Sequence, residues 1–541
     1  MTGGDGPTIK WWGWGDSERR VQLGADAVAM LRSELGEAEP TERASLDQVI
    51  VPPPRPLPRE IADAVGPAAV LTSREHRVRR AAGRSYPDLV RLRSGRLERA
   101  PDAIVLPGSA GEVARVLEIC SRDGIAVVPF GGGTSVVGGV EPWRGDFDGL
   151  VSLDLRRLRG VEVDERSLVA TLGSGLRGPE AEDALAAEGV TLGHFPQSFE
   201  YATIGGFAAT RSAGQASSGY GRFDELVTSV SLIAPEGELR TLRTPHSAAG
   251  PALRELVLGS EGTLGVITAV SARVRPVPER RRYEGWMASD FESGMEIVRS
   301  LAQGGLLPDV VRLSDEAETR VSLALSGTGG AKRALLASYL RFRRRAHGCL
   351  MICGWEGAQA AVERRRGLAG VGLRAGGAAA LGQAPGHAWE RSRYEGPYLR
   401  DELLDLGYMV ETLETAHTWS RLGGLYDGVR AAIGAALAAG GTPGIVMCHL
   451  SHAYPDGASL YFTVLARRRP GQELEQWRDV KSTACQAIVE SGGTITHHHA
   501  VGRDHAPYMR AEIGELGLGT LRAVKERLDP AGIMNPGKLL G

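Results

Sequence analysis

The chain has 541 residues, with 63 basic and 65 acidic side chains, so its formal net charge is −2. With 42% hydrophobic and 24% charged residues, this balance is typical of a folded globular protein and excludes a disordered or fibrous chain. The near-zero net charge gives no basic surface for nucleic acid, so no nucleic-acid partner is expected. At about 150 residues per domain, the length predicts two to four structural units.

The five cysteines are odd in number and scattered, which argues against a disulfide framework and indicates a reducing compartment. Cys349 and Cys353 lie four residues apart, but no second Cys or His pair stands near them as a structural zinc site would need, so we interpret them as buried apolar residues. The sequence shows neither a signal-peptide core nor a run of about 18 apolar residues. We therefore expect a soluble, cytoplasmic enzyme.

Residues 1–95 are predicted to form a helical N-terminal extension. Its charged, helix-like sequence is broken by a proline cluster at residues 52–58, which indicates an extended segment that wraps a larger body.

Residues 96–279 carry the pattern of an α+β domain. An apolar run at residues 103–106 predicts a buried strand, and Ser109 with Glu112 forms a capping box that begins a helix. Residues 125–130 predict the next strand, so this β-α-β unit leads directly into a glycine loop. Further strands at residues 150–155 and 161–173, a helix at 179–188 and a hairpin at 226–242 complete the domain.

Residues 280–495 show a strand-helix-strand pattern that begins again near residue 350. A hairpin over residues 445–466, turned by Pro455, Asp456 and Gly457, follows. This pattern predicts an antiparallel sheet with helices, which would act as a cap. Residues 496–541 are predicted to complete the active site and to pack back on the preceding α+β domain, and within them the tail from residue 505 is predicted to be helical up to Leu528.

The loop PFGGGTS at residues 129–135 is the first candidate ligand site. It matches neither G-x-G-x-x-G nor the Walker form, because no Lys follows the glycines. Three consecutive glycines followed by Thr and Ser let backbone amides point into one concavity, which suits a diphosphate. The alternative is a plain tight turn. A second stretch rich in small residues, 198–221, would let backbone approach a flat ligand closely.

Several blocks, in one order, resemble the FAD-binding proteins of the vanillyl-alcohol oxidase type: PFGGGTS, GHFPQSFEYATIGGFAATRSAG, GSEGTLGVIT, YLRDELLDLGYMVET and GGTITHHHAVGRD. Within that family the chain is most similar to the alkyldihydroxyacetonephosphate synthases of ether-lipid synthesis, from residue 10 to the end. The resemblance implies an α+β fold in which an FAD-binding domain carries an antiparallel-sheet cap for the substrate.

The resemblance also implies FAD as cofactor. It implies non-covalent binding, because Thr134 follows the glycines where covalently flavinylated relatives often have a histidine in or next to this loop. Four segments would hold the cofactor, namely Phe130, Gly131, Gly132, Gly133, Thr134, Ser135 and Val136; Gln197, Ser198, Phe199, Glu200, Tyr201, Ala202 and Thr203; Thr210, Arg211, Ser212 and Ala213; and Glu261, Gly262, Thr263, Leu264, Gly265, Val266 and Ile267.

In the cap, the resemblance places the catalytic tyrosine at Tyr461. The strand pattern supports this assignment independently, because Ser459, Tyr461 and Thr463 share one face while apolar residues share the other. A polar face on an apolar strand indicates a lined cavity; the alternative is a tyrosine at a sheet surface. The resemblance assigns four residues to the substrate side, with Arg400 on the substrate phosphate and Thr412 where Ser is expected: Arg400, Arg312, Thr412 and His194. For both arginines the alternative is an ordinary surface position.

The triplet His497, His498 and His499 is the last candidate. In an extended segment, the first and third imidazoles would share a face and the second would point away. A metal would need a third ligand, for which His449 or His452 is only a guess, so no metal is expected. The resemblance places the triplet at the active site, where neutral imidazoles can move protons at neutral pH.

The implied reaction replaces the acyl group of acyl-dihydroxyacetone phosphate with a long-chain fatty alcohol, giving an ether and a free fatty acid without net redox change. Two alternatives stay open, an FAD-linked oxidase or dehydrogenase of a 2-hydroxy acid or related alcohol, and an FAD-binding protein without turnover. The family also implies a homodimer. The stretch 335–348, with Arg343, Arg344 and Arg345, could rest on a membrane surface, or could be a solvated helix face.

Overall fold

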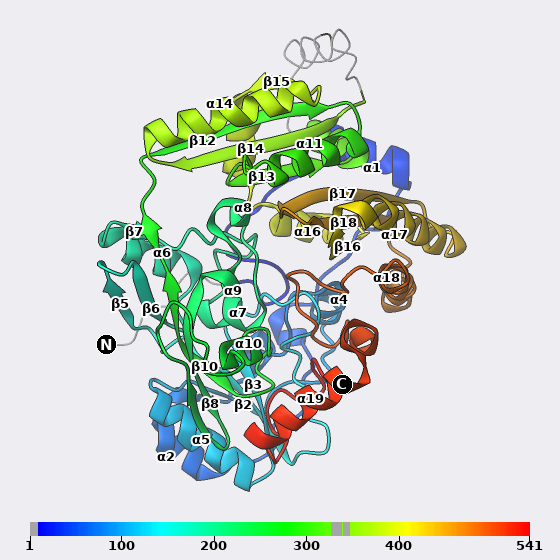
Figure 1. Ribbon diagram of the computed structural model, residues 1–541. Helices are drawn as coiled ribbons and strands as arrows, with labels where there is room; N and C mark the ends of the chain where they lie inside the picture. Colours follow the sequence, from blue (N-terminus) through cyan, green and yellow to red (C-terminus); the bar gives the residue numbers. More distant parts are fainter. Residues whose placement is uncertain (1–8, 326–337, 339–346) are drawn as a thin grey trace.

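The structure is a computed structural model that describes residues 9–325, 338 and 347–541 (Figure 1). The described strands form four sheets, of which the largest lies in the cap and the next two in the preceding part of the chain. The chain is therefore α+β, as predicted. The basic-apolar stretch 335–348 lies, except for three residues, outside the described part of the chain.

A four-stranded sheet, in the order β1-β2-β4-β3, positions the glycine loop at the end of its last strand. The predicted helix α5 begins after Ser109, whose hydroxyl accepts a hydrogen bond from the Glu112 amide at 3.1 Å. The two strands that flank α5 do not pair with each other, because β4 lies between them, parallel to both. The elements are β1 (Val70–Leu71), β2 (Ala103–Val105), α5 (Ala110–Arg122), β3 (Ile125–Phe130) and β4 (Gly149–Asp154).

A five-stranded antiparallel sheet follows, in the order β5-β6-β10-β8-β9, and the hairpin predicted at residues 226–242 occurs in it as β8 and β9. Short helices pack on this sheet around Phe207 and Phe223, which are fully buried. A two-stranded sheet of β11 (Arg275–Pro276) and β7 (Val190–Thr191) leads towards the cap. The elements are β5 (Val161–Asp164), β6 (Val169–Gly173), α6 (Gly178–Ala187), α7 (Ile204–Ala209), α8 (Ser217–Tyr220), α9 (Phe223–Leu226), β8 (Val227–Ala234), β9 (Gly237–Arg240), α10 (Leu253–Val257) and β10 (Val266–Arg273).

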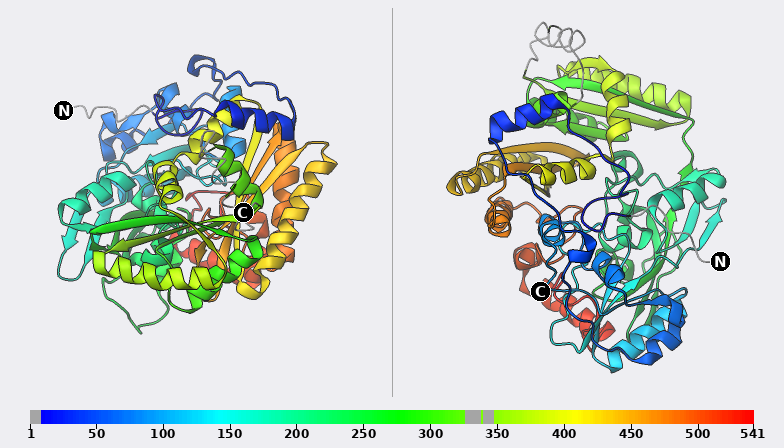
Figure 2. Two further views of the ribbon diagram at one scale, coloured as in Figure 1. Left: turned by 90° about the horizontal axis from the view of Figure 1, so that it is seen from above. Right: turned by 180° about the vertical axis from the view of Figure 1, so that it is seen from behind.

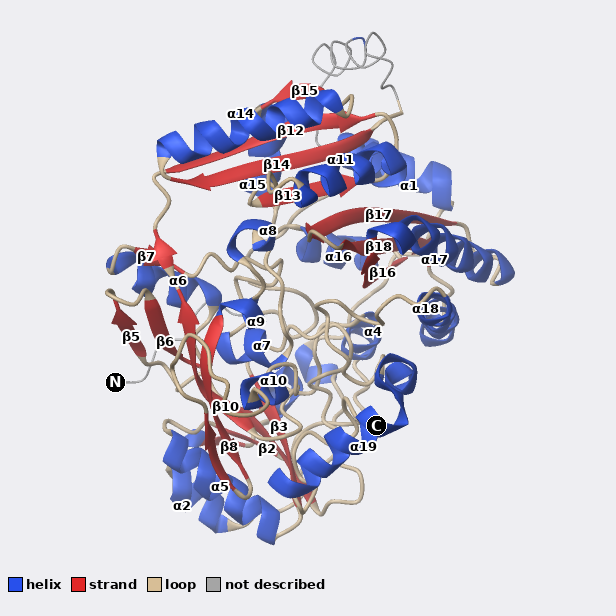
Figure 3. Cartoon of the chain, viewed as in Figure 1, coloured by secondary structure: helices blue, strands red, loops and turns tan. Residues whose placement is uncertain are grey.

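The cap is built on a seven-stranded antiparallel sheet in the order β15-β12-β14-β13-β17-β18-β16. Helices flank this sheet (Figure 3) and share one apolar core with it, in which Cys349 and Cys353 of β14 are fully buried as predicted. The strands are β12 (Arg280–Ala288), β13 (Val310–Ser314), β14 (Cys349–Gly357), β15 (Ala379–Gly382), β16 (Tyr408–Thr418), β17 (Gly444–Ala453) and β18 (Gly457–Arg467). The helices are α11 (Phe291–Gln303), α12 (Glu316–Leu325), α14 (Gln359–Ala375), α15 (Ala384–Ser392), α16 (Gly396–Asp405), α17 (Trp419–Ala439) and α18 (Glu473–Glu490).

The N-terminal residues are spread over both parts of the molecule. Helix α1 (Ala25–Leu35) lies against the cap (Figure 2). Its Leu31 and Leu35 share a small apolar core with cap residues, and α4 (Tyr86–Ser94) contributes Tyr86 to the main cap core. The proline-rich stretch 52–58 lies in neither a helix nor a strand. The remaining elements of this region are α2 (Arg59–Val65) and α3 (Arg74–Arg79).

The C-terminal segment returns to the glycine loop. Helix α19 (Met509–Leu528) is kinked at Gly514, where φ is +70°, and Met534 then forms a bridge with Val127 of β3. The side-chain amide of Asn535 donates to the carbonyl oxygens of Gly139, at 3.1 Å, and Glu261, at 2.6 Å. None of the helices that the structure describes is long and apolar enough to cross a bilayer.

Candidate active site and cofactor-binding loops

Tyr461 lies in a row of three side chains on the cap sheet. Strand pairing places it directly opposite Glu414 of β16 and His449 of β17. The His449 ring stacks on the tyrosine ring with centroids 4.7 Å apart. Leu460 and Phe462, on the opposite face, are fully buried in the cap core. The alternation seen in the sequence therefore separates a polar face from an apolar one.

The hydroxyl of Tyr461 lies beside two other predicted site residues. Burial raises the pKa of Tyr461, while a hydrogen bond with Thr412 and the charge of Arg400 act in the opposite direction. The net effect is a raised pKa, so the phenol stays protonated at neutral pH. The fold thus brings Tyr461, Thr412 and Arg400 together from β18, β16 and α16.

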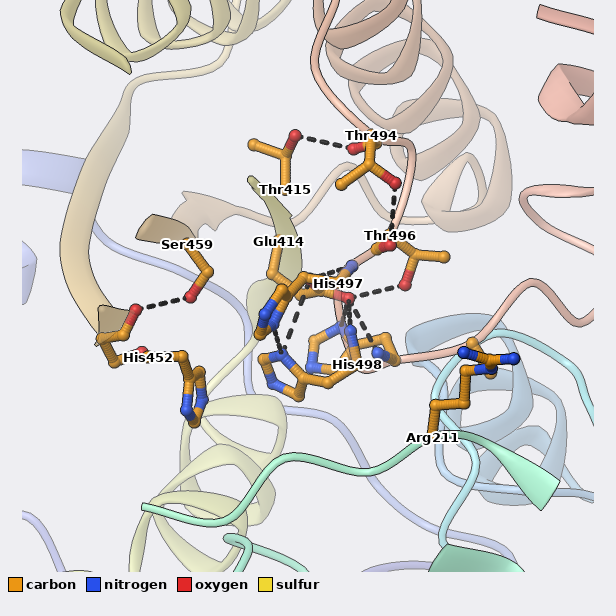
Figure 4. Close-up of polar contacts among 12 residues, drawn as sticks. Arg211, Glu414, Thr415, His452, Ser459, Thr494, Thr496, His497 and His498 are labelled. Carbon is orange, nitrogen blue, oxygen red and sulfur yellow. Dashed lines mark hydrogen bonds and ion pairs between the residues drawn. The ribbon is translucent and has the colours of Figure 1, made fainter. Parts of the chain in front are cut away.

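Glu414 organises the histidine segment (Figure 4). Its fully buried carboxylate accepts hydrogen bonds from the amides of His497 at 2.5 Å, His498 at 3.0 Å and His499 at 2.7 Å, and from the Thr496 hydroxyl at 2.6 Å. Burial opposes ionisation, but the imidazoles and the Thr496 hydroxyl outweigh it, and the pKa of Glu414 lies well below its usual range. One carboxylate therefore fixes the backbone of the whole triplet.

The expectation of an extended triplet is wrong. Consecutive amides alternate in direction along a strand, so three of them cannot face one carboxylate unless the backbone curls. As a result His497 and His498 do not point apart, and their Nδ1 atoms lie 3.2 Å from each other. His498 stacks on Tyr461 with ring centroids 6.0 Å apart, and His499 meets the same ring edge-on at 5.3 Å.

All three imidazoles of the triplet have lowered pKa values. Burial is the main cause for each, and for His497 and His498 the Arg222 guanidinium adds to it. Each imidazole is therefore neutral at neutral pH, with one N–H donor and one lone pair. Such a pair of nitrogens can both take and give a proton.

Glu414 also takes part in a group that could hold a metal ion. One ligand atom each from Glu414, His497 and His498 lies within 4.8 Å of the other two. The third ligand besides His497 and His498 is thus Glu414, and not His449 or His452. Its two oxygens already accept the four hydrogen bonds of the histidine segment, with which a metal ion would compete.

Arg400 presents unused hydrogen-bond donors. One of its Nη atoms donates to the Arg84 carbonyl oxygen at 2.8 Å, while Nε and the other Nη are buried and have no hydrogen-bond partner among the described residues. Burial lowers the pKa of Arg400, but a guanidinium remains charged at neutral pH. A buried charge with two free donors fits an anionic ligand such as a phosphate.

Arg312 is already paired. Its Nη2 donates to Glu318 at 2.8 Å and lies 3.0 Å from Nδ1 of His449, which itself lies 3.0 Å from the same Glu318 oxygen. Burial opposes ionisation of Glu318, but the charges of His449 and Arg312 lower the pKa of this carboxyl to about 2. Arg312 therefore adjoins the His449 ring that stacks on Tyr461.

His194 lies in the interior of the preceding domain, apart from this cluster. Its ring packs on Phe207 and Phe223, with centroids 4.7 and 5.0 Å away, and its Nε2 lies 3.0 Å from the Ser212 hydroxyl. Burial lowers the pKa of His194 to about 3. Its contact with Ser212 connects it to a predicted cofactor segment rather than to Arg400 or Arg312.

The glycine loop after β3 presses against the second predicted cofactor segment. A Cβ atom on Gly132 would lie 1.9 Å from the Tyr201 carbonyl oxygen, and one on Gly131 would lie 2.3 Å from the Thr203 hydroxyl. Gly133 has φ +66°, a conformation that favours glycine. In the part of the chain that the structure describes, no group accepts a hydrogen bond from the amides of residues 131–136. Free amides in a glycine turn suit a diphosphate, so this loop fits FAD.

The other predicted cofactor segments adjoin this loop. The Glu261 amide donates to the Ala209 carbonyl oxygen at 3.0 Å, next to Thr210. The Glu261 carboxylate accepts from the amides of Val501 at 2.8 Å and Gly502 at 2.7 Å, which binds the segment after the histidines to the cofactor domain. Burial raises the pKa of Glu261 to about 7. Arg211 instead faces outward to Asp224 and Glu255.

Three residues that the sequence analysis missed complete the site. Glu414 could have been found from period two, because it shares a strand face with Thr412. Arg84 joins the cofactor and substrate sides: its amide donates to the Ser135 carbonyl oxygen at 2.6 Å, and its own carbonyl oxygen accepts from Arg400. No local sequence pattern marks Arg84. None marks Asp401 either, whose carboxylate accepts hydrogen bonds from Lys10 and from the Trp14 amide of the N-terminal segment.

Known proteins are similar to this chain in sequence and in fold. The model of the FAD binding domain matches residues 101–243, and that of the C-terminal domain of FAD linked oxidases matches residues 277–539. The alkyldihydroxyacetonephosphate synthase of Dictyostelium discoideum is 32% identical over 98% of this chain and 93% of its own length; that of Trypanosoma brucei brucei is 31% identical over 98% and 92%. The chain belongs to the alkyldihydroxyacetonephosphate synthase family.

Membership of this family makes the chain an FAD-dependent enzyme with a cofactor domain and a cap. A solved alkyldihydroxyacetonephosphate synthase structure superposes with a TM-score of 0.84 at 30% identity, over 98% of both chains. The second family model begins at residue 277, just before β12, which belongs to the seven-stranded sheet. The predictions of FAD and of the fold class are confirmed.

Proposed function

We propose that this protein replaces the acyl group of acyl-dihydroxyacetone phosphate with a long-chain fatty alcohol, and so forms the ether bond of ether lipids. One observation carries the proposal: close to Tyr461, Arg400 keeps two buried guanidinium nitrogens that have no hydrogen-bond partner in the described part of the chain. A fixed cation beside proton-handling groups suits a substrate that joins a phosphate to a reactive carbon.

Arg400 binds the substrate phosphate in this proposal. Its contact with the Arg84 carbonyl oxygen fixes the guanidinium, so its free donors lose little conformational entropy when the phosphate arrives. Arg312 supports the site from the other side, because its pairing with Glu318 and His449 orients the ring that stacks on Tyr461.

Tyr461 and the neutral histidines move protons. The reaction removes a proton from the reacting carbon, takes one from the alcohol and returns one to the carbon. His498 and His499, which flank the tyrosine ring, are neutral and can act in both directions. FAD, held without a covalent link by the glycine loop and residues 197–203, would supply the electron-accepting ring on which the carbon centre is activated.

The experiment that tests this function leaves out every electron acceptor. Purified protein loaded with FAD is mixed with palmitoyl-dihydroxyacetone phosphate and hexadecanol under anaerobic conditions, and the products are identified by mass spectrometry. We expect an ether and an equal amount of free palmitate. If no ether forms, while a 2-hydroxy acid bleaches the flavin and air restores the colour, the protein is instead an FAD-linked oxidoreductase.

We further propose that the protein works as a cytoplasmic homodimer. The homodimer rests on the family resemblance, whereas the location rests on the scattered cysteines of the sequence. Light scattering on a sizing column checks the homodimer, because a dimer has twice the chain mass of 57.5 kDa. Peripheral membrane contact through residues 335–348 is proposed from their sequence alone. Replacing Arg343, Arg344 and Arg345 with Gln should reduce co-sedimentation with anionic liposomes.

A further inference from the structure

A chain of three side chains leads outward from Tyr461. The Tyr454 hydroxyl lies 2.9 Å from Nε2 of His497, and Nδ1 of His497 lies 3.2 Å from Nδ1 of His498. His498, the inner end, stacks on Tyr461. Tyr454 and His498 are both half-buried, whereas His497 between them is 9% exposed. The chain thus connects the ring that stacks on Tyr461 with a second, partly exposed side chain, Tyr454.

The contact between the two Nδ1 atoms couples the tautomer of one ring to that of the other. A neutral imidazole has one N–H and one lone pair, so a hydrogen bond between two Nδ1 atoms needs one of them protonated and the other not. If His498 donates, the proton of His497 lies on Nε2 and points to Tyr454. If His497 donates, its Nε2 accepts the Tyr454 proton. Reversing every bond converts one arrangement into the other.

The charges around this chain favour transfer over storage of a proton. Arg222 donates to the His497 carbonyl oxygen at 3.0 Å and hydrogen-bonds Tyr454, and its charge opposes a positive charge on His497. Asp224 and Glu225 also face Tyr454. His452 stacks on His497 at 5.3 Å, and its own Nδ1 is held by Ser217 at 2.6 Å. On the inner side, Glu414 faces both imidazoles.

The proposed reaction releases a proton that has to leave the active site. Exchange of an ester acyl group for an alcohol yields a carboxylate at neutral pH, and hence one free proton per turnover, because fatty acids ionise far below neutral pH. We propose that Tyr454, His497 and His498 form a proton relay that carries this proton from the active site to solvent. The inference rests on the proposed function, and Tyr454 acts through the histidines rather than on the substrate.

Each transfer in the relay balances. His498 takes a proton on Nε2, and its Nδ1 proton moves to Nδ1 of His497. The Nε2 proton of His497 moves to the Tyr454 oxygen, whose own proton leaves to water. All three groups are neutral before and after, and the transfer leaves the chain in the second arrangement. The first arrangement returns, with no proton carried back to the reacting groups, when both imidazoles exchange their protons with water after product release.

Tyr454→Phe breaks the relay at its outer end and keeps the ring. We expect kcat for ether formation to fall at least about tenfold with an unchanged KM, and added imidazole to restore part of the loss by acting as an external proton carrier. Tyr426→Phe is the matched control. It removes another buried cap hydroxyl, which bonds Asp315 at 3.1 Å, and should show neither the kcat loss nor the rescue. A Tyr454→Phe enzyme that is as fast as the wild type, or slow but indifferent to imidazole, overturns the proposal.

A second measurement needs no turnover. In protein labelled with ¹⁵N-histidine, the Nδ1 to Nδ1 contact predicts opposite tautomers for His497 and His498, and Tyr454→Phe should shift the Nε2 signal of His497. Two histidines of the same tautomer overturn the relay even if the wild type forms ether. Opposite tautomers in a protein that forms no ether would support the relay and reject the proposed function.

Discussion

Arg400 donates one hydrogen bond to the carbonyl oxygen of Arg84, whose amide in turn donates to Ser135 in the glycine loop. The residue that would bind the substrate phosphate is therefore fixed by the chain that precedes the cofactor loop. Through two hydrogen bonds of Arg84, the positions of cofactor and substrate depend on each other, although they lie in different domains.

Arg400→Met should weaken substrate binding. Hydrogen bonds to a charged group contribute about 1.5–3 kcal/mol, so we expect KM for acyl-dihydroxyacetone phosphate to rise about 10-fold to 100-fold. FAD content, measured from the absorbance spectrum, should not change. Inorganic phosphate should inhibit the wild type competitively and the variant far less. Arg299→Gln, which removes an exposed arginine of α11, is the control. Unchanged KM in Arg400→Met would contradict the phosphate role.

Tyr461→Phe tests the central proton-handling group. We expect kcat to fall about 100-fold or more, because proton transfer by a positioned side chain contributes about that factor. The ring remains to stack on His449, so the melting temperature should stay close to that of the wild type. Stopped assays of ether and fatty acid measure the effect. Full turnover by a variant that still holds FAD would remove Tyr461 from the mechanism.

Glu414→Gln should release the histidine segment. The side-chain amide would direct N–H groups at backbone amides that now have an acceptor, and buried unsatisfied donors cost about 1–3 kcal/mol each. We expect a clearly lower free energy of unfolding in urea together with the loss of turnover. Thr496→Val removes only one of the four donors and should cost about 1 kcal/mol. Equal losses in the two variants would argue against this role of Glu414.

Sequence alone predicted more of the fold than of the site geometry. The strand at residues 457–467, with alternating polar and apolar residues, gave the correct face for Tyr461, because burial on one side of a sheet enforces period two. The curl of the histidine triplet could not be predicted in this way. It depends on Glu414, more than 80 residues earlier in the chain, and no local pattern encodes a contact across that separation. The hydrogen bond from Arg400 to the Arg84 carbonyl oxygen could not be predicted for the same reason.

Buried histidines predict a loss of stability in mild acid. His194 has a pKa lowered to about 3 by burial, against an ordinary value of 6.5. Below pH 6.5 the unfolded chain binds a proton that the folded chain does not, so stability falls as pH decreases from about 6.5 towards 3. For one such histidine the loss between pH 7.5 and 5.5 is about 1 kcal/mol. Urea unfolding at both pH values should show it. His194→Gln should reduce the difference by about this amount; an identical difference would place the titration elsewhere.

Lys10 tests how the N-terminal segment supports the site. Its buried ammonium lies 3.3 Å from the Asp401 carboxylate, which also accepts from the Trp14 amide at 2.8 Å, next to Arg400 on α16. Arg84 donates to the Lys10 carbonyl oxygen at 3.0 Å. Lys10→Met removes the charge and leaves these two backbone contacts in place. Because small displacements of a positioning group strongly reduce productive binding, we expect KM for the phosphate substrate to rise about tenfold with little change in kcat.

Lys10→Arg should restore KM in large part, since a guanidinium can also pair with Asp401. Initial rates at several concentrations of the acyl substrate separate the two parameters, while FAD absorbance reports the cofactor domain. A fall in kcat with constant KM would assign the N-terminal segment to catalysis instead. An unaffected enzyme would mean that Arg93, which lies 3.7 Å from Asp401, holds α16 without Lys10.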